Sequence, residues 1–107
     1  MTTPIRMVYT TTDDGEVADR LAKTMIERRL AACVKIVPKV SSYYRWEDKV
    51  QCDSEYWLVI KTHHWQVANL KQFISEQHNY DSPEFIVTEI VDGLESYLDW
   101  VEVQTKP

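Results

Sequence analysis

The stretch from Ala31 to Thr62 constrains the fold of this chain more than any other part of the sequence. It contains two long runs rich in β-branched and aromatic residues, which predict two strands joined by a tight turn at Glu47-Asp48. The second run is apolar without interruption from Tyr56 to Ile60, which indicates a strand buried on both faces. The first run alternates, and the period of two predicts that its apolar side chains share one face: Val34, Ile36, Val40, Tyr44 and Trp46.

The length of the first strand predicts an extension beyond the domain itself. Fourteen residues from Cys33 to Trp46 would span ~46 Å at about 3.3 Å per residue. A compact domain of 107 residues has a radius of gyration of about 13 Å and a diameter of roughly 34 Å. Unless Pro38 folds the ribbon back, its outer end overhangs and carries Tyr43, Tyr44 and Trp46. Because large rings are seldom left in water on a two-stranded ribbon, we expect a partner subunit to cover them.

The composition is that of one ordered domain over residues 1–107. Hydrophobic residues make up 44% of the chain, with only two glycines and four prolines, which argues against disorder. The net charge of −5 disfavours nucleic-acid binding, which usually requires a basic face. The N-terminal segment lacks the basic and long apolar regions of a secretory signal or a membrane span. We therefore expect a cytoplasmic protein without membrane contact.

The two cysteines are expected to remain free thiols. A turn at Glu47-Asp48 places Trp46 opposite Lys49 and Tyr43 opposite Cys52. Cys33 would then lie about 33 Å from Tyr43 along the strand. A disulfide requires Cα atoms within about 7 Å. A bulge at Pro38 would shift this register, but not by enough to close the gap.

The remaining sequence predicts helices and strands on either side of the ribbon. A strand at Ile5–Tyr9, ended by three threonines, precedes a helix from about Asp13 to Arg29, and Asp13 is expected to cap this helix together with Glu16. After the ribbon come a helix from His63 or His64 to about His78, a strand at Glu84–Val91 and a short helix at Glu95–Val103.

This order predicts an α+β fold, a ferredoxin-like βαββαβ sandwich with an additional C-terminal helix. Right-handed crossovers place the two longer helices on one face of a four-stranded sheet. Apolar residues occupy both odd and even positions of the strands and therefore point to both faces of the sheet, so the second face must also be covered. Another copy of the chain is the economical partner, and the long hairpin strands would then be used in assembly.

Several motifs in this sequence together resemble one known family. The run AACV-x-I-x-P-x-V-x-S-x-Y-x-W-E-x-K-V begins at Ala31, and E-x5-K-T follows at Glu55 to Thr62. H-x-Y-x-x-P-E occupies His78 to Glu84, and Y-L-D-W begins at Tyr97. The set covers nearly the whole chain in order and resembles the CutA-type divalent-cation tolerance proteins. Each motif alone would be weak, whereas the combination is highly specific.

This resemblance implies a homotrimer with a PII-like, ferredoxin-like fold and pockets in the clefts between subunits. It implies tolerance to copper or another divalent cation, no metal requirement for folding and no catalytic reaction. The pocket carried over from the family comprises Cys33, Trp46, Lys61, His78 and Glu84, with Tyr43 and Tyr44 in the surrounding aromatic run. The chain departs from the family pattern at four positions: Lys35, Asp48, Asn79 and Leu94.

The candidate metal ligands also have structural interpretations. Cys33 and His78 offer sulfur and imidazole, a pairing suited to copper or zinc, and Glu84 could add a carboxylate. A free cysteine at the start of a strand is equally a small buried apolar residue. Lys61 and Glu84 could bind an anion and a cation, or could form an ion pair between neighbouring strands.

The aromatic cluster of Tyr43, Tyr44 and Trp46 could stack on a ligand or anchor a subunit interface. No glycine-rich phosphate loop and no nucleophile signature is present in the sequence, so we expect a protein that is not an enzyme. The leading hypothesis is a homotrimer that binds a divalent metal ion between subunits. The alternative is a structural or signalling trimer that binds a small ligand or a protein partner instead of metal.

Overall fold

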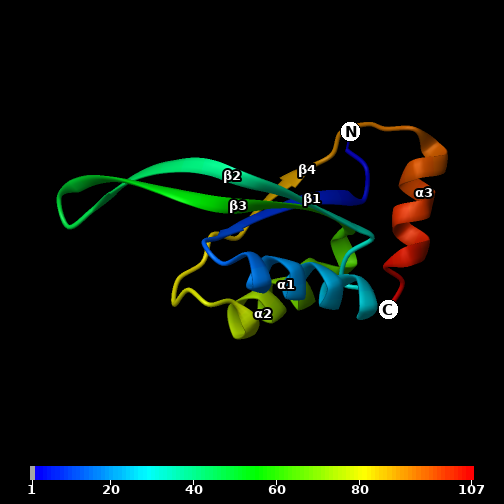
Figure 1. The fold of residues 1–107 in the computed structure, drawn as a ribbon. Coiled ribbons are helices and arrows are strands. Elements are labelled where there is room, and N and C mark those ends of the chain that lie inside the picture. Colours follow the sequence, from blue (N-terminus) through cyan, green and yellow to red (C-terminus); the bar gives the residue numbers. More distant parts are fainter. Residues whose placement is uncertain (1) are drawn as a thin grey trace.

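A four-stranded antiparallel sheet with two helices on one face forms the body of the protein (Figure 1). The computed structural model describes residues 2–107. The elements in chain order are β1 (Ile5–Thr12), α1 (Gly15–Glu27), β2 (Cys33–Trp46), β3 (Lys49–His63), the 3-10 turn η1 (His64–Gln66), α2 (Val67–Gln77), β4 (Ile86–Glu89) and α3 (Glu95–Gln104).

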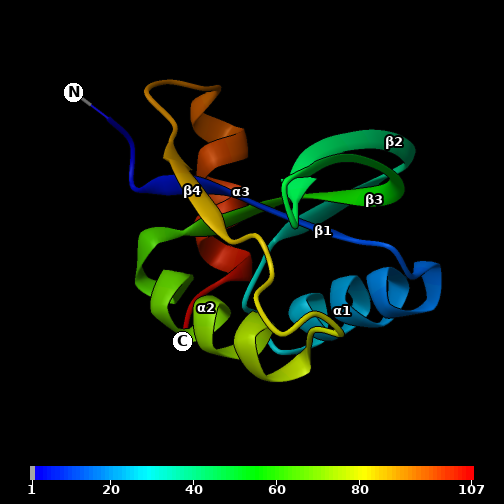
Figure 2. The same ribbon diagram turned by 90° about the vertical axis from the view of Figure 1, so that its left-hand side faces the viewer.

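The strands lie in the order β2-β3-β1-β4, which confirms the predicted ferredoxin-like topology. Helices α1 and α2 lie on the same face of the sheet, and α3 stands across one end of it (Figures 1 and 2). Among residues 2–107, the two outer strands, β2 and β4, each pair with only one neighbouring strand. Within residues 2–107, no helix combines the length and the hydropathy needed to cross a membrane.

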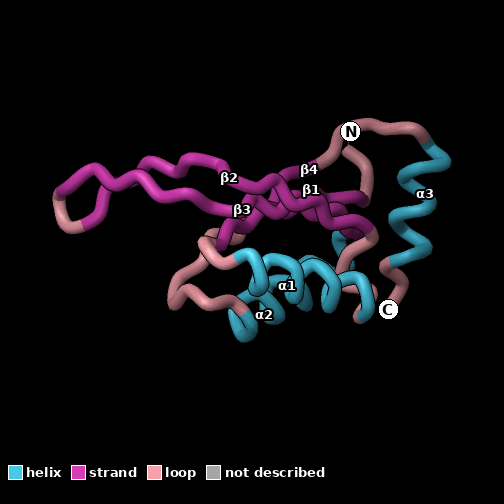
Figure 3. Tube along the Cα trace, viewed as in Figure 1, coloured by secondary structure: helices cyan, strands magenta, loops and turns pink. Residues whose placement is uncertain are grey.

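The ribbon of β2 and β3 extends well beyond the two helices, as its length predicted (Figure 3). The longest dimension of the molecule is 45 Å. The turn is at Glu47-Asp48, where both residues have positive φ (50° and 62°), the backbone that suits a two-residue hairpin. Trp46 lies opposite Lys49, and this confirms the predicted register.

The same register confirms the prediction for the cysteines. Cys33 lies opposite Lys61 at the inner end of the ribbon, and Cys52 lies opposite Tyr43 on the overhang. Both thiols are free. Cys33 is half-buried and Cys52 is exposed.

A bulge interrupts the first long strand. Val37 lies opposite Trp57 and Val40 opposite Glu55, so β2 takes three residue steps where β3 takes two. Lys39, inside the bulge, has a φ of 59°, a left-handed conformation that takes it out of the regular ladder. Pro38 has no N–H to donate to the ladder, which suits it to this position.

The bulge makes the predicted alternation of the first strand wrong over half of its length. Because side chains alternate with a period of two, one extra residue exchanges the two faces. Val34 and Ile36 pack against the core beneath the helices. Val40, Tyr44 and Trp46 instead line hollows on the opposite, helix-free side of the ribbon. The five apolar residues therefore do not share one face.

The N-terminus of α1 differs from the predicted cap by one residue. Asp14, not Asp13, is the N-cap, and its Oδ1 accepts hydrogen bonds from the backbone N–H groups of Glu16 (2.9 Å) and Val17 (3.3 Å). Asp13 instead accepts a bond of 2.9 Å from the Asn79 side chain. Neighbouring aspartates cannot be distinguished by pattern alone, because either can place a carboxylate near the first turn.

Two strand boundaries also differ from the sequence prediction. β1 does not end at Tyr9 but continues to Thr12, because Thr10 and Thr12 are β-branched and fully buried on the helix-covered face. β4 is shorter than the predicted strand at Glu84–Val91 and pairs only through Ile86–Glu89. The segment before it, including Glu84, is therefore a loop.

The core lies between the sheet and the helices. Fully buried side chains from β1, β3, α1 and α2 meet there: Val8, Leu58, Ile60, Ala18, Leu21, Met25, Leu70 and Ile74. The other face of the sheet carries no helix in residues 2–107 (Figure 2). Val37, Trp57 and Ile86 are exposed on this face within one chain. The sheet therefore carries apolar side chains on both faces, as the sequence indicated, and the covering of the second face by another copy stays a prediction.

Candidate functional site

The overhanging ribbon and the loop before β4 enclose the groove in which most of the predicted site residues gather. Tyr43, Tyr44 and Trp46 line it from β2, and Tyr80 and Glu84 line it from the loop. Its volume is about 920 Å³. The structure thus brings together four of the seven predicted site residues. Within a single chain the rings are open to solvent, with Tyr43 73% and Trp46 64% exposed.

The floor of the groove is acidic. Among residues 2–107 no lysine or arginine lines it, whereas five carboxylates do so from three segments of the chain: Asp13, Asp53, Glu55, Asp81 and Glu84. Clustered charges of one sign in a concave surface raise the local concentration of ions of opposite charge. The groove is therefore suited to attract cations.

Two tyrosines organise these carboxylates. The hydroxyl of Tyr80 donates a hydrogen bond of 2.7 Å to Oε2 of Glu55, which is only 9% exposed. Burial and the Glu55 carboxylate raise the pKa of Tyr80 well above its ordinary value, so it stays a donor at neutral pH. The hydroxyl of Tyr44 donates to the Asp53 carboxylate. Because Asn79 also donates to Asp13, three of the five carboxylates are held by hydrogen bonds, two of them by tyrosines.

His78 does not line the groove itself but is bound through both ring nitrogens to the backbone of two residues that do, Thr11 and Tyr80. Its Nε2 lies 2.8 Å from the carbonyl oxygen of Thr11 and donates to it. Its Nδ1 accepts from the N–H of Tyr80 at 3.0 Å. Burial lowers the pKa of the ring, with partial compensation from the Thr11 carbonyl. The neutral ring orients the loop that carries Tyr80 and Glu84, and neither nitrogen is free for a metal ion in this arrangement.

Cys33 and Lys61 form a second cluster at the other end of the sheet. The Nζ of Lys35 donates to the Cys33 Sγ at 3.5 Å, and the neighbouring sulfur raises the pKa of Lys35. The Nζ of Lys61 lies 5.9 Å from the ring centroid of Tyr97, on α3. Burial, together with nearby Lys35, lowers the pKa of Lys61. This end of the sheet offers a thiol beside two cations.

Within one chain these two clusters remain apart. Cys33 and Lys61 lie level with Met7 on β1, whereas Thr11, which holds His78, lies four residues further along that strand. The suggested ion pair of Lys61 with Glu84 is not formed within residues 2–107, where the one contact between a basic group and a carboxylate at ion-pair distance joins His63 to Glu102. In that same part of the chain, no three His, Cys, Asp or Glu side chains are grouped to hold a metal ion.

Residues 6–104 match the family described as CutA1 divalent ion tolerance protein. The chain belongs to the CutA1 family. The divalent-cation tolerance protein CutA of Thermus thermophilus is 40% identical over 99 residues, which cover 92% of this chain and 96% of that relative. The chloroplastic protein CutA of Arabidopsis thaliana is 41% identical over 105 residues, covering 98% of this chain. This chain spans about three-fifths of the length of two plant relatives, 58% and 59%.

Solved CutA1 structures share the fold described above. The crystal structure of CutA1 from Oryza sativa is 42% identical, has a TM-score of 0.94 and matches 98% of this chain and 96% of its own. The divalent cation tolerance protein from Thermus thermophilus has a TM-score of 0.92 at 39% identity, over 95% of this chain and 99% of its own. The names of such relatives support a role in divalent-ion tolerance for the CutA1 family.

Among the groove residues that sequence reasoning did not select, Glu55 and Tyr80 form a partly buried hydrogen-bonded pair. Glu55 and Tyr80 occur within the CutA1 motifs, yet neither has a chemical signature of its own in the sequence. They lie 25 residues apart and meet only because the loop after α2 folds back onto β3. A buried glutamate that pairs with a tyrosine depends on tertiary contacts. The only signal for this pair in the sequence is therefore that both residues occupy positions in the family motifs.

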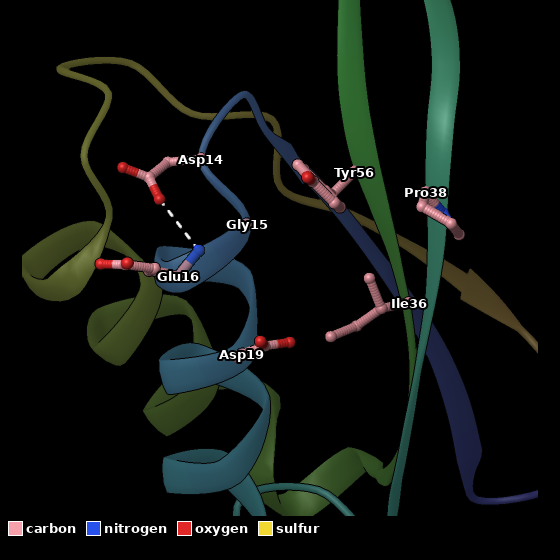
Figure 4. Close-up of a pocket in the computed structure, with 7 residues that line it drawn as sticks. All are labelled: Asp14, Gly15, Glu16, Asp19, Ile36, Pro38 and Tyr56. Carbon is pink, nitrogen blue, oxygen red and sulfur yellow. Dashed lines mark hydrogen bonds between the residues drawn. The ribbon is translucent and has the colours of Figure 1, made fainter.

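Figure 4 shows a second hollow in this CutA1 chain, between the start of α1 and the ribbon. Its polar lining is Asp14, Glu16 and Asp19, with Tyr56 and Pro38 opposite. The Asp14 carboxylate is already bound to the backbone N–H of Glu16 as the helix cap. None of the predicted site residues lines this hollow, so the groove between the outer end of the ribbon and the loop before β4 remains the stronger candidate.

Proposed function

We propose that this protein is a cytoplasmic homotrimer that binds a divalent metal ion, such as copper, in the clefts between its subunits. The function that we propose is binding of the ion, without a catalytic reaction. The observation that carries it is the placement of the candidate ligands. Cys33 begins the strand at one edge of the sheet, and Glu84 leads into the strand at the opposite edge. Only contact between chains can bring these two side chains to one ion.

Two further features support a closed assembly. β2 and β4 each have one edge that no other strand of residues 2–107 pairs with, and free edges favour pairing with another chain. The helix-free face exposes Val37, Trp57 and Ile86, and the overhang exposes Trp46. An apolar face and an aromatic arm on the same molecule are typical of an interface. Three copies that close in a ring would use both edges of every sheet.

The ligand chemistry favours a soft or borderline ion. A thiolate selects copper or zinc over magnesium and calcium, which prefer cages of oxygen atoms. His78 can join this ligand set only if one ring nitrogen leaves Thr11 or Tyr80. Cys33 and Glu84 carry no such prior bond of their own to the backbone. We therefore expect Cys33 to dominate the affinity and His78 to contribute less.

Native mass spectrometry and titration calorimetry test this proposal on the same preparations. We expect a mass of three 12.6 kDa chains and saturable copper binding that weakens strongly in Cys33→Ser. Cys52→Ser is the matched control, because Cys52 is the second thiol and lies outside this cluster. The trimer should persist in both variants. Unchanged copper affinity in Cys33→Ser, or a monomeric parent, would overturn the proposal.

A second function, a trimer that binds an organic ligand or a protein partner instead of metal, is favoured by the state of His78. Both of its nitrogens serve the backbone, so the best nitrogen ligand has a structural role within the chain. If this alternative holds, the parent, Cys33→Ser and His78→Gln should all bind copper with the same affinity. A trimer that shows stoichiometric copper loss in Cys33→Ser argues against this alternative.

A further inference from the structure

His63 occupies a junction between the sheet, η1 and α3. It is the last residue of β3, lies opposite Ile5 on β1 and is only 3% exposed. Its Nδ1 accepts from the backbone N–H of Trp65 at 3.2 Å and so caps η1. Its Nε2 lies 3.3 Å from Oε1 of Glu102 on α3. The Trp65 ring stacks on the imidazole with centroids 3.5 Å apart.

The C-terminal end of α3 is attached to this junction. Trp65 Nε1 and Gln66 Nε2 both donate to the carbonyl oxygen of Thr105, at 2.8 Å and 2.9 Å. Val101 is fully buried in a small cluster with Ile5. The side chains that donate hydrogen bonds to this end of α3 thus come mainly from η1. His63 in turn fixes the conformation of η1, because its ring caps that turn.

We propose that His63 is a proton-sensitive latch that holds α3 against the sheet while its ring is neutral and releases it when the ring is protonated. The neutral ring accepts at Nδ1 and donates at Nε2, as both contacts require. A proton on Nδ1 would face the Trp65 N–H, so the cap would be lost. The ring would then leave η1, and the bonds from Trp65 and Gln66 to Thr105 would go with it.

The charges around the ring act in both directions. Arg6 on β1 and His64 on η1 disfavour a second positive charge, whereas Glu102 on α3 favours it. Burial is the largest effect, and together these lower the pKa of His63 below its ordinary value. A released ring has the ordinary value of about 6.5 and therefore binds a proton at a higher pH than the docked ring. Docking of α3 consequently weakens as the pH falls below about 6.5.

The release would change the surface near Cys33. Tyr97 lies on α3 and covers the Lys61 ammonium group. When α3 leaves the sheet, the Lys61 ammonium group becomes more exposed to solvent, and the cluster of Cys33, Lys35 and Lys61 becomes accessible. The latch goes beyond the proposed metal binding and operates without any metal ion.

Hydrogen exchange measured by mass spectrometry tests the latch on the intact protein. Between pH 7.5 and pH 5, protection of α3, corrected for intrinsic exchange, should fall by up to about tenfold per pH unit below 6.5, with α1 as internal reference. His63→Asn retains a neutral acceptor for the Trp65 N–H and should remove this dependence. His64→Asn, the matched control on the next residue, should leave it in place.

Nuclear magnetic resonance of the unmodified protein gives a second measurement that needs no variant. We expect the His63 ring and the amides of α3 to titrate with a common midpoint below pH 6.5. Titration of the ring without any change in the α3 amides would overturn the proposal. Equal pH dependence of α3 in the parent and in His63→Asn would do the same.

Discussion

The inner and outer halves of one ribbon differ sharply in what surrounds them. Both halves belong to the same pair of antiparallel strands, and the bulge at Pro38 and Lys39 separates them. In the inner half, Leu58 and Ile60 are completely buried beneath the helices. In the outer half, Val50 is 72% exposed and the large rings of Tyr43 and Trp46 face solvent. The backbones of both halves are therefore paired antiparallel, whereas the burial of their side chains is opposite.

This difference separates two sources of stability. The inner half contributes to folding of the single chain, because its side chains are removed from water within that chain. A two-stranded ribbon alone is marginal in water, so the outer half needs another surface to become ordered and stable. Substitutions in the two halves should consequently affect different equilibria, namely unfolding of the chain and dissociation of the assembly.

The largest effect is expected in the inner half. Leu58→Ala should lower the free energy of unfolding by about 3 kcal/mol, because it removes a fully buried side chain and leaves a cavity. Urea denaturation followed by circular dichroism measures this change. The matched control Val50→Ala, on the same strand in the outer half, should change it by less than about 0.5 kcal/mol. A similar loss for both variants would abolish the distinction between the two halves.

An intermediate effect is expected at the outer end. If the Trp46 ring anchors a neighbouring subunit, Trp46→Ala should weaken each interface by about 2 kcal/mol and leave the fold of the chain intact. Light scattering across a denaturant series would show dissociation at a lower concentration than in the parent. Arg45→Ala, which lies on the opposite face of the same strand, is the control. If subunit count and midpoint are unchanged in Trp46→Ala, the ring does not anchor the assembly.

The smallest effect is expected at an unpaired polar group in the inner half. The hydroxyl of Thr10 is buried and has no hydrogen-bond partner among residues 2–107. Thr10→Val should raise the free energy of unfolding by about 1 kcal/mol, because it removes an unpaired polar group at nearly constant volume. In the control Thr62→Val the sign should reverse, since that hydroxyl donates to the Leu30 carbonyl at 2.6 Å. Thermal unfolding of both variants would distinguish these results, and a less stable Thr10→Val would contradict the account.

The sequence predicted the ribbon well because its main features are local. Strand composition and the pair Glu47-Asp48 determined the turn, and the turn then determined that Trp46 lies opposite Lys49. The order of helices and strands determined the topology for the same reason. These predictions needed only periodicity and the length of connections.

The site was predicted less completely because it depends on tertiary contacts. No pattern indicated that both nitrogens of His78 bind the backbone, or that Glu55 is buried beside Tyr80. Cys33 and Glu84 lie at opposite edges of the sheet, and this separation can be recognised only from the strand order. Residue types identified possible ligands, whereas their availability was set by contacts between distant segments.

The bulge at Pro38 and Lys39 also limits how this ribbon can vary in length during evolution. Removing one residue there would turn the whole outer half over, so that Tyr43 and Arg45 would take the face now occupied by Tyr44 and Trp46. Residues added at the tip, beyond Trp46, would leave the phase of every earlier side chain unchanged. Natural insertions and deletions should therefore accumulate at the turn and be rare at the bulge.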